Sequence, residues 1–155
     1  MTRTATLISD LAAGATRALA ALVPAGTRLC LGFVFVQSGW GKLHNLPNVV
    51  DYFASLGIPA PQVQAPFVAS VELLGGALLL AGLLTRVVSI PLAATMVVAL
   101  VTAKRADVHG LGDLFGTIEF LYLVALGQLA AFGPGPASLD RFLFRRPKPS
   151  AAGGI

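Results

Sequence analysis

A run of 20 almost wholly apolar residues, 65–84, constrains the fold more than any other part of the sequence. At about 1.5 Å of rise per residue, a helix of this length spans roughly 30 Å, the hydrocarbon thickness of a bilayer. Its only charged residue is Glu72, and seven leucines follow from Leu73 onward. At about −0.5 kcal/mol each on the insertion scale, these leucines offset the approximately +3 kcal/mol of one carboxylate. The run therefore predicts a transmembrane helix.

The composition of the whole chain also favours a membrane protein. Of its 155 residues, 55% are hydrophobic and only 12% are charged, whereas soluble domains carry about 25% charged residues. The net charge of +4 comes from basic residues at the edges of apolar runs, where they orient a protein in the membrane and do not form a nucleic-acid surface. The single cysteine, Cys30, excludes an internal disulfide or a CxxC pair.

Three further apolar runs have the length and the ends of membrane helices. The first follows Pro24, the third begins after a tight turn at Thr85, and the fourth ends at the helix-breaking sequence GPGP. The sequence thus predicts an all-α, integral membrane four-helix bundle with spans at about 26–43, 65–84, 87–103 and 115–132.

The remaining segments set the limits of this domain. Residues 1–22 fit either a short interfacial, amphipathic helix or a flexible lead-in. Between the first two spans, VVDYFASLGIP predicts a short amphipathic helix that ends at Gly57. Residues 141–155 form a basic tail rich in proline and glycine, which we expect to be disordered. The four-helix domain is therefore expected over residues 23–140.

Small residues share the charged face of the first two spans. Steps of three and four residues from Glu72 lead to glycines, and the same steps connect the glycines of the first span with its two cations. Faces of small residues pack against other helices and not against lipid. The glycines expected at helix contacts are Gly32, Gly39, Gly75, Gly76 and Gly82.

Four ionisable residues are candidates for a ligand site or an ion-pair cluster: Glu72, Lys42, Arg28 and Glu119. By residue count, Lys42 and the two acids lie in the same half of the bundle. Lys42, or Arg28 from the other end of the first span, could neutralise Glu72, because an unpaired buried acid would otherwise keep its proton. The alternatives are a structural ion pair, a site for protons or a quinone, and groups that lie apart.

Motifs for metal binding and catalysis are missing from the sequence. His44 and His109 do not stand at a metal-ligand spacing, so we expect both to be solvated loop residues. Cys30 is expected to be a buried, inert side chain. We therefore predict no metal, no catalytic residue and no bound cofactor, and keep a quinone open as a ligand.

Several segments together resemble the DoxX family of bacterial membrane proteins. The resemblance covers roughly residues 26–140 and is carried by RLCLGFVFVQSGWGKL, YFASLGIPAP, VELLGGALLLAGLLTR, PLAATMVVAL and GPGPASLD. It implies a four-helix membrane protein. In some members it also implies association with oxidoreductases, as in the related DoxD subunit of thiosulfate:quinone oxidoreductase.

Three functions are consistent with these features. The first is an auxiliary, non-catalytic inner-membrane subunit or scaffold that supports a membrane oxidoreductase or a redox-stress complex. The second is a protein that binds a quinone-like or other lipophilic ligand at a buried Glu72 site. The third is a scaffold or chaperone for another membrane protein. The expected partners are the lipid bilayer, a membrane oxidoreductase and further copies of the chain, and no nucleic acid.

The distribution of lysine and arginine predicts the orientation in the membrane. Seven basic residues fall on the side of the two termini and three on the other side, which places both termini in the cytoplasm.

Cysteine labelling tests this topology. In a Cys30→Ser background, single cysteines at Asp51 and Asp107 should react in intact cells with an impermeant maleimide, whereas one at Ser150 should not. Labelling at position 150 with protection of the other two would reverse the orientation.

Overall fold

The computed structural model describes residues 2–135 and 138–140, and for residues 2–10 and 17 it describes the backbone alone. All regular structure within these residues is α-helical. The helices are α1 (Thr2–His44), α2 (Leu46–Ser55), α3 (Pro61–Ala81), α4 (Thr85–Val101), α5 (Leu111–Gly116) and α6 (Ile118–Phe132). The predicted all-α fold with four main packed helices is confirmed, and the tail from residue 141 lies outside the described residues.

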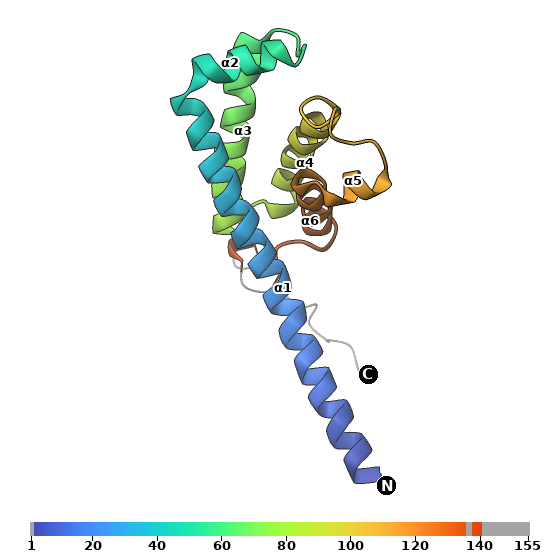
Figure 1. Cartoon of the computed structure of the whole chain (residues 1–155). Helices are drawn as coiled ribbons and strands as arrows, with labels where there is room; N and C mark the ends of the chain where they lie inside the picture. Colours follow the sequence, from blue (N-terminus) through green and yellow to red (C-terminus); the bar gives the residue numbers. More distant parts are fainter. Residues whose placement is uncertain (1, 136–137, 141–155) are drawn as a thin grey trace, which may run out of the picture.

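The four main helices form two pairs. α1 packs along α3, and α4 packs along α6 (Figure 1). The two pairs meet through a hydrophobic core to which α1, α3, α4 and α6 all contribute, with Phe35, Leu79, Leu92 and Leu126 among its most buried side chains. α2 lies across the end of the α1–α3 pair and contacts both helices.

Helix α1 is longer than the sequence predicted. The predicted first span, 26–43, lies within one helix of 43 residues that continues through Pro24 back to Thr2. A proline removes one backbone hydrogen bond, and the alanine-rich sequence before it favours helix strongly enough to continue through it. The first half of α1 projects beyond the bundle (Figure 1), and its hydrophobic side chains at Leu11, Leu19 and Leu22 are exposed.

Two helices are long and apolar enough to cross a membrane, namely residues 11–44 of α1 and α3. α4 and α6 are shorter apolar helices of 17 and 15 residues. The predicted fourth span, 115–132, is interrupted at Thr117, whose backbone is extended and whose hydroxyl accepts a hydrogen bond from the amide of Phe120 at 3.4 Å. This hydroxyl caps the helix, so α6 begins at Ile118 and α5 is a separate turn of helix.

A tight turn joins the second and third helices as predicted, but it lies at residues 82–84 and not at Thr85, which is the first residue of α4. α3 ends at Gly82, which has a φ of +68°, and Leu84 also has a positive φ of +51°. The amphipathic helix predicted before Gly57 corresponds to α2, and Gly57 itself has a φ of +72°. Glycine adopts such angles without the clash that a side chain introduces.

Glycines set the distance between α1 and α3. A Cβ atom added to Gly76 would lie 2.6 Å from the amide nitrogen of Val36 and 2.8 Å from the carbonyl oxygen of Gly32. A Cβ at Gly39 would lie 2.7 Å from the carbonyl oxygen of Ala69. Because these neighbours are backbone atoms, they cannot rotate away, and the two helices approach as closely as only small residues permit.

Substitution of Gly76 by alanine tests this close approach. The added methyl group should push α1 away from α3 and lower the free energy of unfolding by about 1–3 kcal/mol, the usual cost of overpacking. Gly127→Ala on α6 is the matched control, because no atom lies within 4 Å of its added Cβ. Unfolding in detergent should show Gly76→Ala destabilised and Gly127→Ala unchanged or slightly stabilised. Equal effects would show that Gly76 does not set the helix spacing.

Candidate functional site

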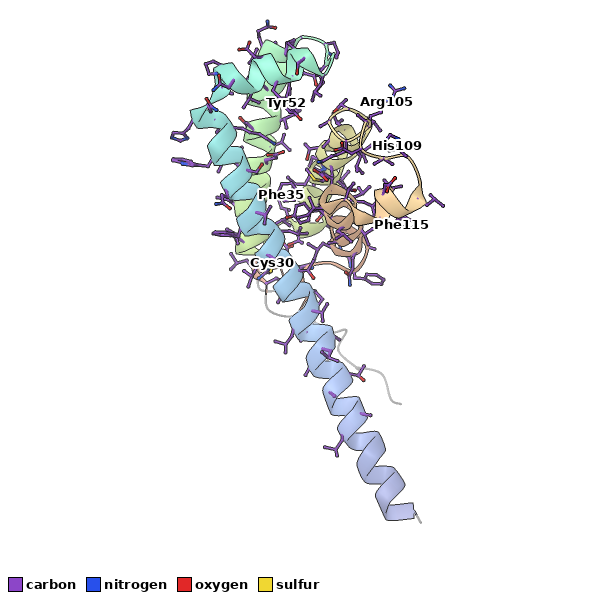
Figure 2. All side chains as sticks on the ribbon, viewed as in Figure 1. Cys30, Phe35, Tyr52, Arg105, His109 and Phe115 are labelled. Carbon is purple, nitrogen blue, oxygen red and sulfur yellow. The ribbon has the colours of Figure 1, made fainter. Side chains whose placement is uncertain are left out.

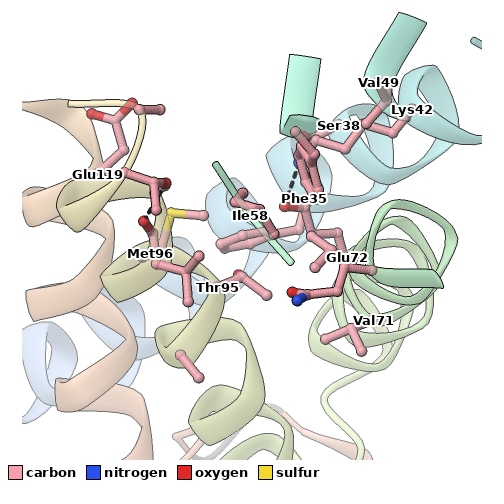
Figure 3. A pocket seen from close by; sticks show the side chains of 18 of the residues that line it. Phe35, Ser38, Lys42, Val49, Ile58, Val71, Glu72, Thr95, Met96 and Glu119 are labelled. Carbon is pink, nitrogen blue, oxygen red and sulfur yellow. Dashed lines mark hydrogen bonds and ion pairs between the residues drawn. The ribbon is translucent and has the colours of Figure 1, made fainter. Parts of the chain in front are cut away.

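A cavity of about 610 Å³ lies among the four main helices and α2 (Figure 3). Its volume falls within the range of small-molecule sites, about 300–1,000 Å³. Most of its lining is apolar, with aromatic rings from α1, α2, α3 and α6 at Phe35, Phe53, Phe67 and Tyr122. The only charged side chains among its lining residues are Lys42, Glu72 and Glu119.

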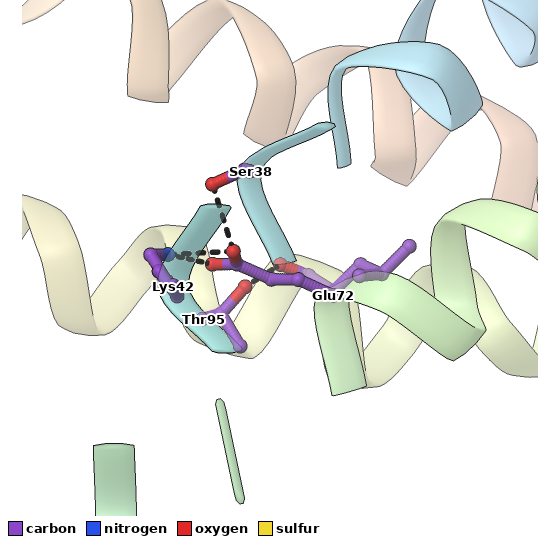
Figure 4. A network of polar contacts seen from close by, with 5 residues as sticks. Ser38, Lys42, Glu72 and Thr95 are labelled. Atoms are coloured by element: carbon purple, nitrogen blue, oxygen red, sulfur yellow. Dashed lines mark hydrogen bonds and ion pairs between the residues drawn. The ribbon is translucent and has the colours of Figure 1, made fainter. Parts of the chain in front are cut away.

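Lys42 and Glu72 form an ion pair at the wall built by α1 and α3. The Lys42 ammonium nitrogen lies 2.5 Å from both carboxylate oxygens of Glu72, and the Ser38 hydroxyl donates a hydrogen bond of 2.9 Å to one of them (Figure 4). Glu72 is only 1% exposed, whereas the Lys42 side chain is 29% exposed. The acid is therefore held inside the bundle by a cation that reaches toward its edge.

The sequence explains how α1 and α3 bring these groups together. Ser38 and Lys42 are four residues apart and therefore lie on one face of α1. Gly39 on the same helix lets α3 approach at Ala69, and Glu72 lies one turn further along α3. The ion pair therefore depends on the glycine contacts between the two helices.

The ion pair leaves hydrogen-bonding capacity that a ligand could use. An ammonium group carries three N–H donors, and within the described part of the chain the Glu72 carboxylate is the sole hydrogen-bond partner of the Lys42 ammonium group. Because Lys42 also lines the cavity, at least one N–H can be directed toward a bound molecule. The network presents a donor to the cavity while the opposite charges neutralise each other.

Glu119 lies on the other side of the same cavity, in the first turn of α6. Figure 3 shows it beside Met96, on the wall formed by α4 and α6, apart from Lys42 and Glu72. Its Oε2 atom is buried and has no hydrogen-bond partner among the described residues. The three predicted residues therefore share one cavity, but only Lys42 and Glu72 are in contact.

Arg28 lies at the opposite end of the bundle and is not a partner of Glu72. It is 6% exposed and packs against Gly82, where a Cβ atom would lie 2.7 Å from the guanidinium carbon. Asp140 supplies an opposite charge to it. The carboxylate of Asp140 also accepts hydrogen bonds from the backbone amides of Leu84 at 2.6 Å and Thr85 at 3.0 Å. Arg28 therefore belongs to a structural junction that joins α1, the α3–α4 turn and the segment after α6.

Sequence reasoning missed Ser38 and Asp140. Ser38 stands four residues before Lys42, so the helical face of Lys42 could have indicated it. Asp140 follows the helix-breaking GPGP sequence, and an acidic residue after a break is typical of capping residues, but nothing local identifies α4 as the helix that it caps.

The histidines and the cysteine do not contribute to the cavity. His44 lies at the surface with its Nδ1 2.9 Å from the carbonyl oxygen of Trp40, and His109 is also exposed. The described residues contain no group of three or more potential metal ligands. Cys30 is exposed on α1, so its expected burial is wrong. Its helix turns this small side chain away from α3.

Comparison with known proteins gives a family match and several bacterial relatives. The family model described as DoxX matches residues 11–105. The chain is 32% identical over 123 residues to the putative oxidoreductase CatD of Bacillus subtilis, covering 78% of this chain and 87% of that protein. It is 31% identical over 139 residues to the inner membrane protein YphA of Escherichia coli, covering 83% and 93%. Its identity to the inner membrane protein YqjF of the same organism is 26% over 119 residues, covering 77% and 90%. No solved structure gives a significant match.

A double-mutant cycle tests the coupling of Lys42 and Glu72. Glu72→Leu strands a cation that can reach the surface, and Lys42→Met strands a buried carboxylate. Each should therefore lower the free energy of unfolding, by about 2–4 kcal/mol, with Lys42→Met the more severe. Glu72→Gln should be milder because it can still accept the hydrogen bond from Ser38.

The double variant Lys42→Met/Glu72→Leu should lose less stability than the sum of the two single variants, with a coupling of about 1–3 kcal/mol. Unfolding in detergent measures all four proteins. Strict additivity, or a rise in stability for Glu72→Leu alone, would show that the pair does not stabilise the bundle.

Proposed function

This chain belongs to the DoxX family of membrane proteins, and from that premise we propose that it is an auxiliary inner-membrane subunit that holds a lipophilic small molecule for a membrane oxidoreductase. The observation that carries the proposal is the cavity of about 610 Å³ between the helix pairs, apolar over most of its wall and supplied with one ion pair. Pockets that combine apolar walls with a few placed polar groups are typical small-molecule sites.

The ligand class follows from the chemistry of the walls. Phe35, Phe53 and Phe67 exclude water from a hydrocarbon body, and Lys42 directs an N–H donor into the same space. A ligand that fits both the apolar walls and the N–H donor is mainly apolar and carries a hydrogen-bond acceptor such as a carbonyl oxygen. Quinones have this composition and dissolve in the bilayer that surrounds the protein.

The redox part of the proposal is supported by the relative from Bacillus subtilis that is named a putative oxidoreductase. Within this chain the described residues include no cluster of metal ligands, and the sequence has no second cysteine for dithiol chemistry. We therefore assign binding and positioning to this chain, and electron transfer to a partner. Both termini are proposed to lie in the cytoplasm, on the basis of the lysine and arginine distribution.

A scaffold function is the second candidate, and the projecting half of α1 favours it. Leu11, Leu19, Leu22 and Val23 are exposed on this segment, and a membrane helix with an uncovered face can pack against the helix of another protein. A scaffold needs no occupied cavity, so ligand binding separates the two functions.

Thermal shift with quinone analogues tests the binding function. A ligand that binds the folded state alone stabilises it by about 2.7 kcal/mol at 100 times its Kd, so short-chain ubiquinone or menaquinone analogues should raise the Tm of the purified protein by several degrees. The rise should be smaller in Lys42→Met, which removes the donor, and unchanged in Lys104→Met, where the exposed lysine does not line the cavity.

The isolated chain should not turn over a quinone analogue with thiosulfate or a dithiol as the electron donor. Turnover that is lost in Glu72→Gln would overturn the auxiliary role. If neither quinones nor other lipophilic compounds stabilise the wild-type protein, the scaffold function replaces the binding function.

A further inference from the structure

The charges that face the cavity do not balance. Lys42 and Glu72 neutralise each other through their ion pair, and the remaining charged residue is Glu119, on the opposite wall. Its buried Oε2 atom has no hydrogen-bond partner, and no basic side chain except Lys42 lines the cavity in the described part of the chain. Among the described residues, the cavity therefore has one acidic side chain without a counter-ion.

Glu119 differs from Glu72 in its exposure and in its place on the helix, because Glu119 is only partly buried whereas Glu72 is fully buried. Glu119 is in the first turn of α6, a helix of 15 residues that is capped by Thr117. Acidic side chains in a first turn interact favourably with the positive end of the helix dipole. No basic side chain among the described residues pairs with Glu119, so a ligand can supply the positive charge.

An aromatic ring, that of Tyr122, lies on the same helix face as the Glu119 side chain. Tyr122 is three residues after Glu119, so both side chains lie on one side of α6, and both line the cavity. The Tyr122 ring contacts Phe35 of α1, with ring centroids 6.1 Å apart and planes at 55°. A cation is attracted both to the face of an aromatic ring and to a carboxylate, and aromatic groups are the usual lining of sites for substituted ammonium ions.

We infer that the cavity selects lipophilic cations, in which a substituted ammonium group lies beside Glu119 and Tyr122 and an aromatic or alkyl body fills the apolar space. The inference rests on the proposed ligand-binding function and adds the charge of the ligand to it. Of two lipophilic molecules with the same size and shape, the cavity binds the cationic one more tightly, because only the cation neutralises the carboxylate.

A matched pair of probes isolates the effect of charge. The first is (6-phenylhexyl)trimethylammonium, and the second is its neutral carbon isostere, with a tert-butyl group in place of the trimethylammonium group. Binding to the full chain is measured by titration calorimetry in uncharged maltoside micelles, with empty micelles as the blank. The wild-type protein should bind the cation at least about tenfold more tightly than the isostere, as expected for a desolvated cation–carboxylate contact.

Variants assign this preference to Glu119. Glu119→Gln keeps the shape of the side chain and should reduce the preference to within about twofold, while it leaves the affinity for the neutral isostere unchanged. Asp107→Asn is the matched control, since it removes one negative charge at an exposed residue that does not line the cavity, and it should keep the full preference. Tyr122→Leu should lower the affinity for the cation more than the affinity for the isostere. The Phe115 ring is exposed and lies outside the cavity, so Phe115→Leu should change neither affinity.

The outcomes separate this inference from the proposed function. Equal binding of both probes by the wild-type protein, or a preference that survives in Glu119→Gln, would overturn the cation selectivity and leave ligand binding intact. If neither probe nor any quinone analogue binds, the proposed function itself fails, and the inference fails with it. If Glu119→Gln does not fold, the cation selectivity is tested by Tyr122→Leu and Phe115→Leu. A loss of preference for the cation in Tyr122→Leu alone supports it, and equal effects of the two variants overturn it.

Discussion

The structure depends on the contact between α1 and α3, where two helices approach so closely that their backbones touch at glycines. Gly39 and Gly76 leave no space for a Cβ atom at this contact. The same approach carries Glu72 into reach of Lys42 and Ser38. A carboxylate in the interior of a membrane bundle is costly without a partner, so the glycine contact and the ion pair support each other.

The second constraint lies at the opposite end of the bundle, where the helix pairs are joined. Asp140 caps the start of α4 through the amides of Leu84 and Thr85, and its own amide donates a hydrogen bond of 2.9 Å to the carbonyl oxygen of Gly82. Arg28 is buried beside this junction, and Figure 2 shows nearby Cys30 on the same stretch of α1. The bundle is therefore held together at the junction and by its core, and the cavity occupies the half toward α2.

The cavity has a neutralised ion pair on one wall and an unpaired acidic side chain on the other. The ion pair on one wall is neutral as a unit and offers an N–H donor, whereas Glu119 on the other wall has no counter-ion among the described residues. Apolar and aromatic side chains occupy the space between them. Such a cavity is suited to hold and orient a molecule taken up from the bilayer, and the proposed auxiliary role requires no more of this chain.

The sequence by itself determined those features that depend on local hydrophobicity and backbone preference. Long apolar runs identified the membrane helices, and Gly57 indicated the end of α2, because each signal lies within the segment that it describes. The small residues around Glu72 also indicated that this face of the helix packs against another helix.

Only the tertiary structure decided which groups meet. Lys42 and Arg28 were both candidate partners for Glu72 in the sequence, and the choice depends on the relative depth and rotation of α1 and α3, which no local pattern records. The same holds for Asp140, whose capping of α4 joins residues 55 and 56 positions apart, and for Glu119, which shares the cavity without touching the ion pair. Contacts of this kind are set by how helices pack against one another, because hydrophobic periodicity specifies which face of a helix is buried but not what lies opposite that face.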